Sequence, residues 1–145
     1  MLGKPVLFDT VFIDAPCSGT GTMRRHPEIP WRLTEKDVTV ELPKLQLTML
    51  KEAAARVAAG GELIYATCSV FAEENTQVVD AFLASPEGVG FSVAPLSEAQ
   101  ILQLPDFEQA KKLVSVRQND RGLFQSVPVN ADSYDGHFCV RLVHK

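Results

Sequence analysis

Several signatures that would assign this 145-residue chain to a particular class of protein are missing. No apolar run approaches the roughly 20 residues that a membrane-spanning helix needs, so we expect no contact with a membrane. The short apolar stretch after the first methionine has no signal-peptide cleavage site. No two cysteines form a Cys-x-x-Cys pair, and the three histidines do not fall at zinc-ligand spacing, so the sequence predicts no metal site.

Basic residues are in deficit as well. Fourteen Lys and Arg stand against 18 Asp and Glu, which gives a net charge of -4 at pH 7. Nucleic-acid-binding domains often carry a basic excess, so the charge argues against that class unless the basic surface lies in another domain. The 46% hydrophobic and 22% charged residues are typical of a globular protein, and 145 residues suffice for one domain with its own core.

Cysteine is scarce, and its three copies lie far apart at Cys17, Cys68 and Cys139. An odd number of distant cysteines favours reduced thiols in a cytoplasmic protein over a disulfide framework. Cys139 lies inside an apolar segment near the C-terminus, where a free cysteine behaves as a small hydrophobic residue. We therefore expect Cys139 in the core.

One long helix is expected in the first half of the chain. Thr34 followed by Asp37 resembles a capping box and predicts a helix start. Pro43 should break or restart this helix. After Pro43, apolar residues recur at helical spacing at Leu47, Leu50, Ala54, Val57 and Ala58. Gly60 and Gly61 should end the helix.

The remaining pattern predicts an α/β fold. A buried strand is expected from Val6 to Ile13, and an apolar helix face is formed by Val78, Val79, Phe82 and Leu83. Strand–helix alternation of this kind favours parallel pairing with right-handed crossovers. The last two strands should form an antiparallel hairpin across a polar turn with Asn130, Asp132 and Asp135, and 96–118 should hold a helix and irregular connections. The further strands are expected at 62–67, 91–94, 122–127 and 137–143, and the second helix at 73–84.

Two cysteine-bearing polar segments follow the first two strands. Residues 14–21 follow the first strand, and residues 67–69, which include Cys68, follow the second. Ligands in open α/β sheets bind beyond the carboxyl ends of the strands, and neighbouring parallel strands end at the same edge. Cys17 and Cys68 should therefore lie close together. Taken singly, each cysteine is more often a buried hydrophobic residue, and Asp14, which lies just ahead of a proline, is more often a turn former.

A set of sequence blocks makes the chain recognisable. DAPCSGTG at 14–21, RRHPEI at 24–29 with Trp31, a Gln46–Leu50 helix, GGELIYATCS at 60–69, EEN at 73–75 and DGHF at 135–138 occur in this order. Together they resemble the Sun-type (Fmu) RNA cytosine-5 methyltransferases over nearly the whole chain. DAPCSGTG and YATCS are highly specific in combination. The block that begins at Arg24 looks most like the bacterial branch that modifies small-subunit (16S) ribosomal RNA.

The resemblance implies roles for individual residues. Cys68 would be the nucleophile that adds to carbon 6 of cytosine, and Cys17 would act when the adduct breaks down. Asp14 would face the amino edge of the base and the methyl end of the cofactor, with Pro16 beside it. The expected RNA contacts are Arg24, Arg25 and Arg32, for which a solvated basic loop is an equally good interpretation.

The same resemblance implies that much of the enzyme lies outside this sequence. S-adenosylmethionine is the family's methyl donor, but the Gly-rich loop and the ribose-binding acidic residue that hold it are not found in residues 1–145, nor is the N-terminal RNA-binding domain. We therefore expect the C-terminal half of a Rossmann-like class I S-adenosylmethionine-dependent methyltransferase sheet, inactive alone. The strand from Val6 to Ile13 would become an exposed edge and favour self-association. His137 departs from the family's usual Phe.

Two other functions remain open at this point. In DNA cytosine-5 methyltransferases the nucleophile belongs to a Pro-Cys motif, so Cys17 would attack, although such enzymes have no use for a second thiol at Cys68. The other alternative is a non-catalytic remnant used for binding or assembly. Its support is the absent cofactor site, and the retention of Asp14 and both cysteines argues against it.

Overall fold

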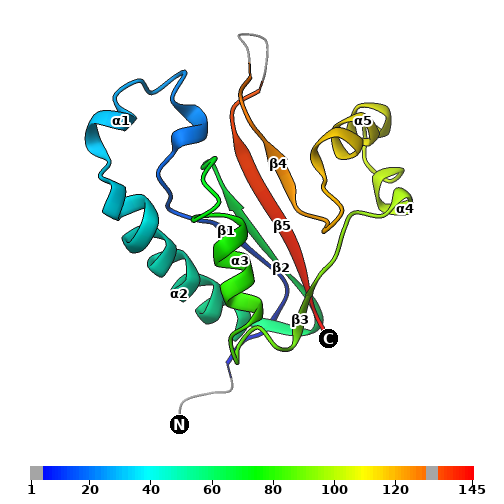
Figure 1. Cartoon of the computed structure of the whole chain (residues 1–145). Coiled ribbons are helices and arrows are strands. Elements are labelled where there is room, and N and C mark those ends of the chain that lie inside the picture. The colour runs from blue at the N-terminus through cyan, green and yellow to red at the C-terminus, as the bar shows by residue number, and fades with distance from the viewer. Residues whose placement is uncertain (1–4, 130–133) are drawn as a thin grey trace.

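One mixed sheet organises the chain, of which the computed structural model describes residues 5–129 and 134–145. The strand order is β1-β2-β5-β3, and β4 also pairs with β5 (Figure 1). β1 and β2 are parallel, whereas β5 runs antiparallel to β2, β3 and β4. The α/β fold and the terminal hairpin are thus confirmed; Asn130 and Asp132 of its turn lie outside the described residues. The strands are β1 (Phe8–Asp14), β2 (Val57–Thr67), β3 (Phe91–Val93), β4 (Phe124–Ser126) and β5 (His137–His144).

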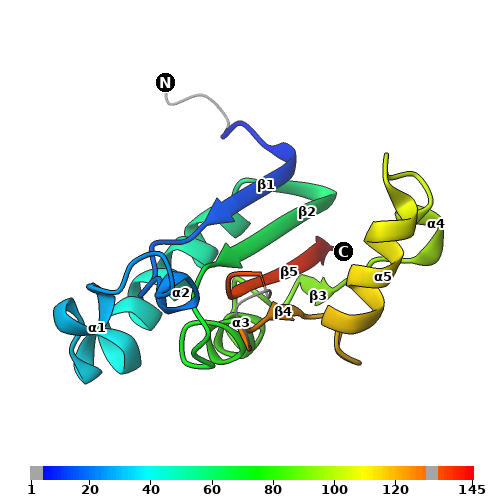
Figure 2. The same cartoon turned by 90° about the horizontal axis from the view of Figure 1, so that it is seen from above.

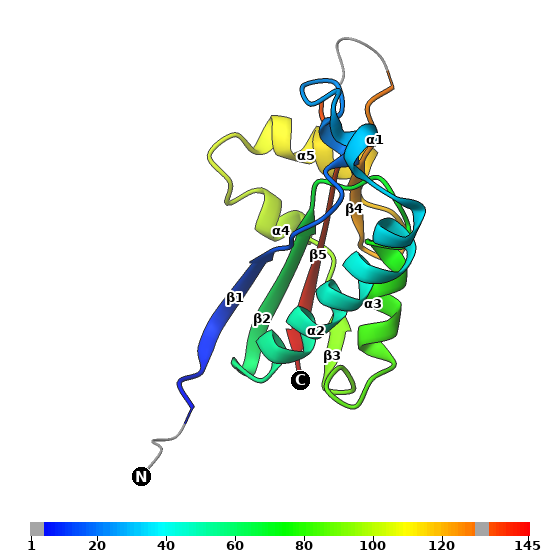
Figure 3. The ribbon, with the colours of Figure 1, turned by 90° about the vertical axis from the view of Figure 1, so that its left-hand side faces the viewer.

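Helices lie on both sides of this sheet. α2 and α3 pack against one face, and α4 and α5 lie on the other side near β4 and β3 (Figures 2 and 3). In the described part of the chain no helix has the length and apolar character to cross a membrane. The helices are α1 (Ile29–Arg32), α2 (Leu42–Ala54), α3 (Thr76–Leu83), α4 (Glu98–Ile101) and α5 (Phe107–Arg117), with a 3-10 turn η1 (Thr20–Thr22) and a π turn η2 (Asp37–Glu41).

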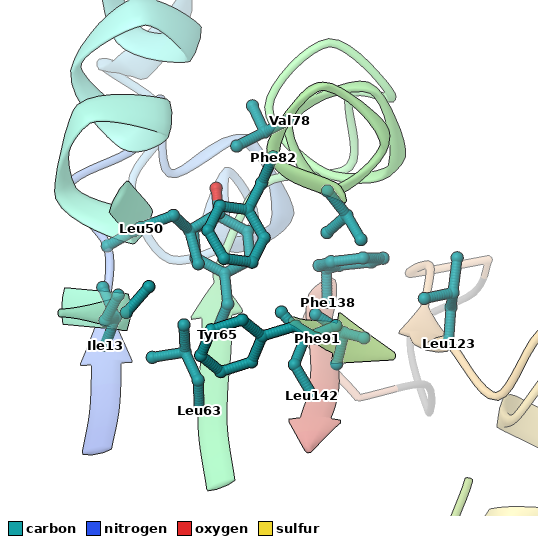
Figure 4. Packing of buried hydrophobic residues seen from close by; sticks show 14 of the residues in the cluster. Ile13, Leu50, Leu63, Tyr65, Val78, Phe82, Phe91, Leu123, Phe138 and Leu142 are labelled. Carbon is teal, nitrogen blue, oxygen red and sulfur yellow. The ribbon is translucent and has the colours of Figure 1, made fainter. Parts of the chain in front are cut away.

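The core lies between the sheet and the α2–α3 pair. Alternate residues of the central strands, among them Tyr65 of β2 and Phe138 of β5, point toward these helices (Figure 4). The predicted apolar face of the second helix is confirmed, with Phe82 fully buried. Alternate burial along a strand is what the two-residue period of its side chains requires. Further members of the core are Ile13, Leu50, Leu63, Val78, Val79, Phe91, Leu123, Val140 and Leu142.

The start of the long helix is as predicted, but its course differs. The Thr34 N–H donates to Asp37 Oδ2 (2.8 Å), and the Asp37 N–H donates to Thr34 Oγ1 (3.2 Å), which completes the capping box. Pro43 does not break the helix, because a π turn precedes it and places it in the first turn of α2. A missing N–H is least costly in a first turn.

The prediction that Gly60 and Gly61 end a helix is wrong. α2 ends at Ala54, and Val57 and Ala58 already belong to β2. The β1–β2 register shifts at this point, so the glycines form an irregularity within the strand. Gly60 has a φ of 76°, and a Cβ on Gly61 would stand 2.9 Å from the Asp9 carbonyl oxygen. The glycines are therefore needed for a strand bulge and a close backbone approach.

Two burial predictions also need correction. The first strand was expected to be buried, but of the seven described residues of β1 only Ile13 is buried, because β1 has β2 on one side and lies at the edge of the sheet. Phe8 and Phe12 are 52% and 61% exposed. Cys139 is only partly buried and belongs to the sheet face opposite the core, where it and Phe124 help to line a cavity of about 300 Å³.

Candidate active site

The two cysteines that the sequence places at strand ends are in contact. Cys17 lies in the loop after β1, Cys68 follows β2 directly, and their Sγ atoms are 3.3 Å apart. The parallel pairing continues past the strands, since the Ala15 N–H donates to the Ala66 carbonyl (2.9 Å). The predicted convergence is therefore confirmed. We call the two loops, residues 15–21 and 68–71, the cysteine rim.

The other predicted residues of this segment lie at the same edge of the sheet. Asp14 is the last residue of β1, and both Asp14 and Pro16 are exposed. The Asp14 carboxylate makes no hydrogen bond or ion pair with the described side chains, so it is available to a ligand. The Pro16 carbonyl is engaged inward, because it accepts a hydrogen bond from Gln46 Nε2 (3.0 Å).

The buried Glu74 side chain accepts hydrogen bonds from both loops of the cysteine rim. Its Oε1 accepts from the Ser18 N–H (2.8 Å), and its Oε2 accepts from the Ser69 hydroxyl (2.5 Å). Ser18 follows Cys17 and Ser69 follows Cys68, so one fully buried carboxylate contacts the neighbours of both thiols. The Tyr65 hydroxyl donates to the Glu74 carbonyl (2.6 Å) and holds its backbone as well.

Gln46 of α2 joins the same network. Its Nε2 donates both to Glu74 Oε1 (3.0 Å) and to the Pro16 carbonyl. Its Oε1 is buried and has no hydrogen-bond partner among the described residues. The side-chain amide has this orientation because a flipped amide would place Oε1 against two other acceptors, the Pro16 carbonyl and Glu74 Oε1. One buried acceptor is thus left unsatisfied, at a cost of about 1–3 kcal/mol, to satisfy two others.

Asn75 fixes the loop that carries Cys68. It is fully buried at the N-cap of α3, its Nδ2 donates to the Ser69 carbonyl (2.9 Å), and its Oδ1 accepts from the Thr67 hydroxyl (2.6 Å). The residues on either side of Cys68 are therefore both tied to one side chain. Buried polar groups need such partners, and here they also define the loop conformation.

The two thiols are partly buried and in contact with each other. Burial is the main cause that raises the pKa of Cys17 to about 12, and the hydrogen bond with Cys68 adds to it. Burial, followed by the Glu74 carboxylate, also raises the pKa of Tyr65. Cys17 is therefore a neutral thiol at physiological pH. A neutral thiol is a poor nucleophile but can donate or relay a proton.

The C-terminal hairpin packs on the cysteine rim at Gly21. The Gly21 N–H donates to the Cys68 carbonyl (2.8 Å), and the Gly21 carbonyl accepts from the Gly136 N–H (2.8 Å). A Cβ on Gly21 would stand 2.1 Å from the Gly136 carbonyl oxygen. Glycine is needed here for close backbone approach, and three of the recognisable sequence blocks meet at this contact.

The three arginines predicted to contact RNA do not form one cluster. Arg24 and Arg25 both form ion pairs with Asp135, the latter with a 2.7 Å hydrogen bond from Nε. Burial alone would raise the pKa of Asp135, but Arg25 and Arg24 together lower it. Arg32 lies exposed on α1. Arg24 also lines a cavity of about 510 Å³ with Arg117 of α5 and His137.

Sequence reasoning assigned no role to Glu74, Gln46 or Asn75. Glu74 and Asn75 belong to the helix expected at 73–84 and to the EEN block, and Gln46 belongs to another block, but no side-chain role followed from either. The available signal is the EEN tripeptide just before an apolar helix face, because three consecutive helical positions cover more than half a turn and one of them is expected to face the core. No group of three His, Cys, Asp or Glu that could hold a metal occurs in residues 5–129 and 134–145.

Sequence comparison finds relatives that are named as ribosomal RNA methyltransferases. Ribosomal RNA small subunit methyltransferase B of Klebsiella pneumoniae (strain 342) is 48% identical over 77 residues, which cover 53% of this chain and 18% of that protein. The protein of the same name from Citrobacter koseri is 41% identical over 103 residues, covering 70% and 24%. The chain therefore spans about a fifth of the length of these curated relatives.

Solved structures agree with this comparison. The crystal structure of PH0851 matches with a TM-score of 0.69 and 34% identity, over 92% of this chain and 26% of that one. NSun6 from Pyrococcus horikoshii with SFG has a TM-score of 0.68 at 20% identity, over 96% and 30%, which supports the fold alone. The family model described as "16S rRNA methyltransferase RsmB/F" matches residues 1–128. The chain thus belongs to the RsmB/F family of 16S rRNA methyltransferases.

Proposed function

We propose that this chain forms the base-handling part of an RNA cytosine-5 methyltransferase that modifies 16S ribosomal RNA. The observation that carries the proposal is the 3.3 Å contact between Cys17 and Cys68 at the carboxyl ends of two parallel strands. Membership of an rRNA methyltransferase family supports the substrate class. We propose that residues 1–145 form part of the catalytic domain of such a methyltransferase.

Cys68 is the proposed nucleophile. Carbon 5 of cytosine is too weak a nucleophile to take a methyl group unaided. When the Cys68 thiolate bonds to carbon 6, the electron pair of the 5,6 double bond moves to carbon 5, which can then attack a methyl group. The target base must be unstacked to reach the rim, which favours a loop or helix end of the RNA.

Cys17 is proposed to act after methyl transfer. The carbon-5 proton must pass to a base, solvent water in this scheme, while its electron pair re-forms the 5,6 double bond. The Cys68 thiolate then leaves carbon 6 and can take a proton from the Cys17 thiol. The raised pKa of Cys17 supports a role as a neutral thiol at this stage, not as the attacking thiolate. The same property argues against the DNA-type alternative, in which Cys17 would attack.

Asp14 and Pro16 are the residues that would adjoin the methyl donor. S-adenosylmethionine would supply an electrophilic methyl group when bound. The exposed Asp14 carboxylate at the end of β1 fits the position beside that methyl end and the cytosine amino group. An ionised carboxylate there can accept a hydrogen bond from the cytosine amino group and so orient the base for attack. The parts that hold the adenosine are not among these residues, so we propose that the isolated chain is inactive.

RNA contacts are proposed for Arg24, Arg25 and Arg32. Arg24 and Arg25 are 43% and 59% exposed at their side chains despite their ion pairs with Asp135. A phosphate can compete for such exposed arginines, since surface ion pairs contribute only about 0–1 kcal/mol. Removal of these charges should weaken RNA binding and reduce its salt dependence.

The catalytic assignment is tested by covalent trapping. This chain would replace the matching segment of the Klebsiella pneumoniae relative, and the chimera would be mixed with S-adenosylmethionine and RNA that contains 5-fluorocytosine. Fluorine cannot leave as a proton does, so the adduct persists. We expect the adduct to disappear in Cys68→Ala and to remain in Cys17→Ala. Loss only in Cys17→Ala would favour the DNA-type alternative.

The incomplete cofactor site gives a second test. Calorimetry should detect no S-adenosylmethionine binding by the isolated chain, whereas the chimera should bind it. Micromolar binding by the isolated chain would contradict our assignment of the adenosine site to residues outside this sequence.

A further inference from the structure

We propose that Glu74 is a positioning residue that sets the distance between the Cys17 and Cys68 thiols. The proposal deepens the proposed function, because the roles of the thiols come from it. The Glu74 carboxylate itself touches neither base nor cofactor in this scheme. It acts on the neighbours of the two cysteines, and so determines where both thiols stand.

The first argument is the distribution of the hydrogen bonds. Each loop of the cysteine rim gives Glu74 one donor, the Ser18 N–H at 2.8 Å and the Ser69 hydroxyl at 2.5 Å. Ser18 and Ser69 are also linked directly through their hydroxyls at 3.2 Å, and both are buried. A change at Glu74 therefore reaches Cys17 and Cys68 within one residue on each side.

The second argument is the cost of placing a carboxylate here. Glu74 is completely buried, and no Lys or Arg among the described residues forms an ion pair with it. A buried charge without a cation is expensive unless hydrogen bonds satisfy it. Its oxygens take three donors, the third being Gln46 Nε2 at 3.0 Å. Ordinary core packing at this position needs only an apolar side chain, so the carboxylate indicates a requirement for acceptors.

The third argument is the orientation of Gln46. Its two Nε2 hydrogen bonds, to Glu74 and to the Pro16 carbonyl, connect the network to the residue before Cys17. Its Oε1 remains buried without a partner in the described part of the chain. The Cys17 loop is thus held on both sides of the thiol, at Pro16 and at Ser18, by groups that depend on Glu74.

Glutamine at this position distinguishes hydrogen bonding from charge. In Glu74→Gln the amide oxygen can still accept from Ser18 and Gln46, and the amide nitrogen can donate to the Ser69 hydroxyl. In Glu74→Ala every one of these bonds is lost. Glu73→Ala is the matched control, because the neighbouring side chain is only partly buried and makes no hydrogen bond to the cysteine rim among the described residues.

The distance between the thiols can be measured without RNA or cofactor. In a Cys139→Ala background, dibromobimane becomes fluorescent only after it has alkylated two thiols of one molecule. Its bridging rate divided by the alkylation rate of monobromobimane reports juxtaposition separately from exposure. We expect this ratio to fall at least about tenfold in Glu74→Ala, to stay within about threefold in Glu74→Gln, and to be unchanged in Glu73→Ala.

Each outcome bears on the proposal. An unchanged ratio in folded Glu74→Ala would overturn it, and so would an equal loss in Glu74→Gln. If circular dichroism shows that Glu74→Ala is unfolded, Ser69→Ala provides a smaller change. It removes the hydroxyl that donates to Glu74, together with the hydrogen bonds that this hydroxyl accepts from Ser18 and Phe71. Its ratio should fall about threefold, and no fall would again overturn the proposal. Failure of the trapping experiment with normal bridging would instead reject the proposed function and leave this assignment intact.

Discussion

Apolar side chains are usually buried and polar ones exposed, and the cysteine rim and the β1 edge depart from this rule in opposite ways. At the rim, polar side chains such as Glu74 and Asn75 are completely buried and hydrogen-bonded. At the edge, apolar side chains such as Phe8 and Phe12 are more than half exposed. Buried polar groups with partners indicate a finished local structure, whereas a group of exposed large apolar side chains indicates a surface that normally has a neighbour.

The difference shows which part of the sheet edge has its loops fully held by residues of this chain. The cysteine rim, for which we propose the handling of the base, is held by hydrogen bonds within the described residues. The side on which β1 would meet another strand has no partner among the described residues. Variants at the cysteine rim and at the β1 edge test this difference.

The largest effect is expected from Asn75→Ala at the cysteine rim. The change leaves the Ser69 carbonyl without its donor and the Thr67 hydroxyl without its acceptor, and it should lower the free energy of unfolding by about 2–4 kcal/mol. Urea denaturation measures this loss. Gln77→Ala, an exposed change in the next turn, should stay within about 0.5 kcal/mol. Equal losses would mean that the rim network has no special stability.

A slightly smaller loss is expected from Gly21→Ala. The new Cβ would stand 2.1 Å from the Gly136 carbonyl oxygen, so backbone must move, at a cost of about 1–3 kcal/mol. Gly90→Ala is the control, since its Cβ would meet a side chain and not backbone, the His144 ring at 3.1 Å, which needs to shift by only a few tenths of an ångström. Thermal denaturation of the two variants should separate them. A stable Gly21→Ala protein would show that the hairpin and the rim are not closely packed.

Cys17 should show its raised pKa in the pH dependence of alkylation. Its rate should rise without a plateau through pH 10, whereas the urea-unfolded chain should level off near the ordinary value of 9.0. Mass spectrometry of iodoacetamide-treated Cys139→Ala measures both. Because the folded state holds this proton more tightly, the contribution to stability is present below pH 9.0 and is lost as pH rises toward about 12. A plateau near pH 9 in the folded chain would contradict the assignment of Cys17 as a neutral thiol.

The smallest effect on stability, and a clear one on assembly, is expected from Phe12→Lys at the β1 edge. Phe12 is 61% exposed, so the change should alter the free energy of unfolding by about 0.5 kcal/mol or less. We predict that the unmodified chain self-associates through this edge and that Phe12→Lys is monomeric, since charged side chains discourage edge pairing. Size-exclusion chromatography with light scattering tests both. A monomeric unmodified chain would refute the prediction.

Sequence reasoning predicted the parts of the site that depend on local pattern. The strand ends placed Cys17 and Cys68 together because the carboxyl ends of neighbouring parallel strands meet at one edge. The predicted helix extended too far, to Gly60, because Val57 and Ala58 fit a helical spacing as well as they fit a strand. Short apolar runs often have this ambiguity.

Other parts depend on contacts that no local pattern specifies. The partner of Arg25 is Asp135, from the far end of the chain. Glu74 could not be distinguished from its neighbour Glu73 by type or spacing, and only the packed structure shows which of the two faces the cysteine rim. Polar networks of this kind are fixed by tertiary packing.

The contact between Gly21 and Gly136 has a consequence for the order in which the molecule is assembled. The loop that carries Cys17 contacts Gly136, a residue 115 positions after Gly21, so the loop can settle only once that later segment has been made. Contacts between distant parts of a chain also form late in folding, because loop closure costs entropy. The contact between the two thiols should therefore form late, after the segment that carries Gly136 has packed on the rim.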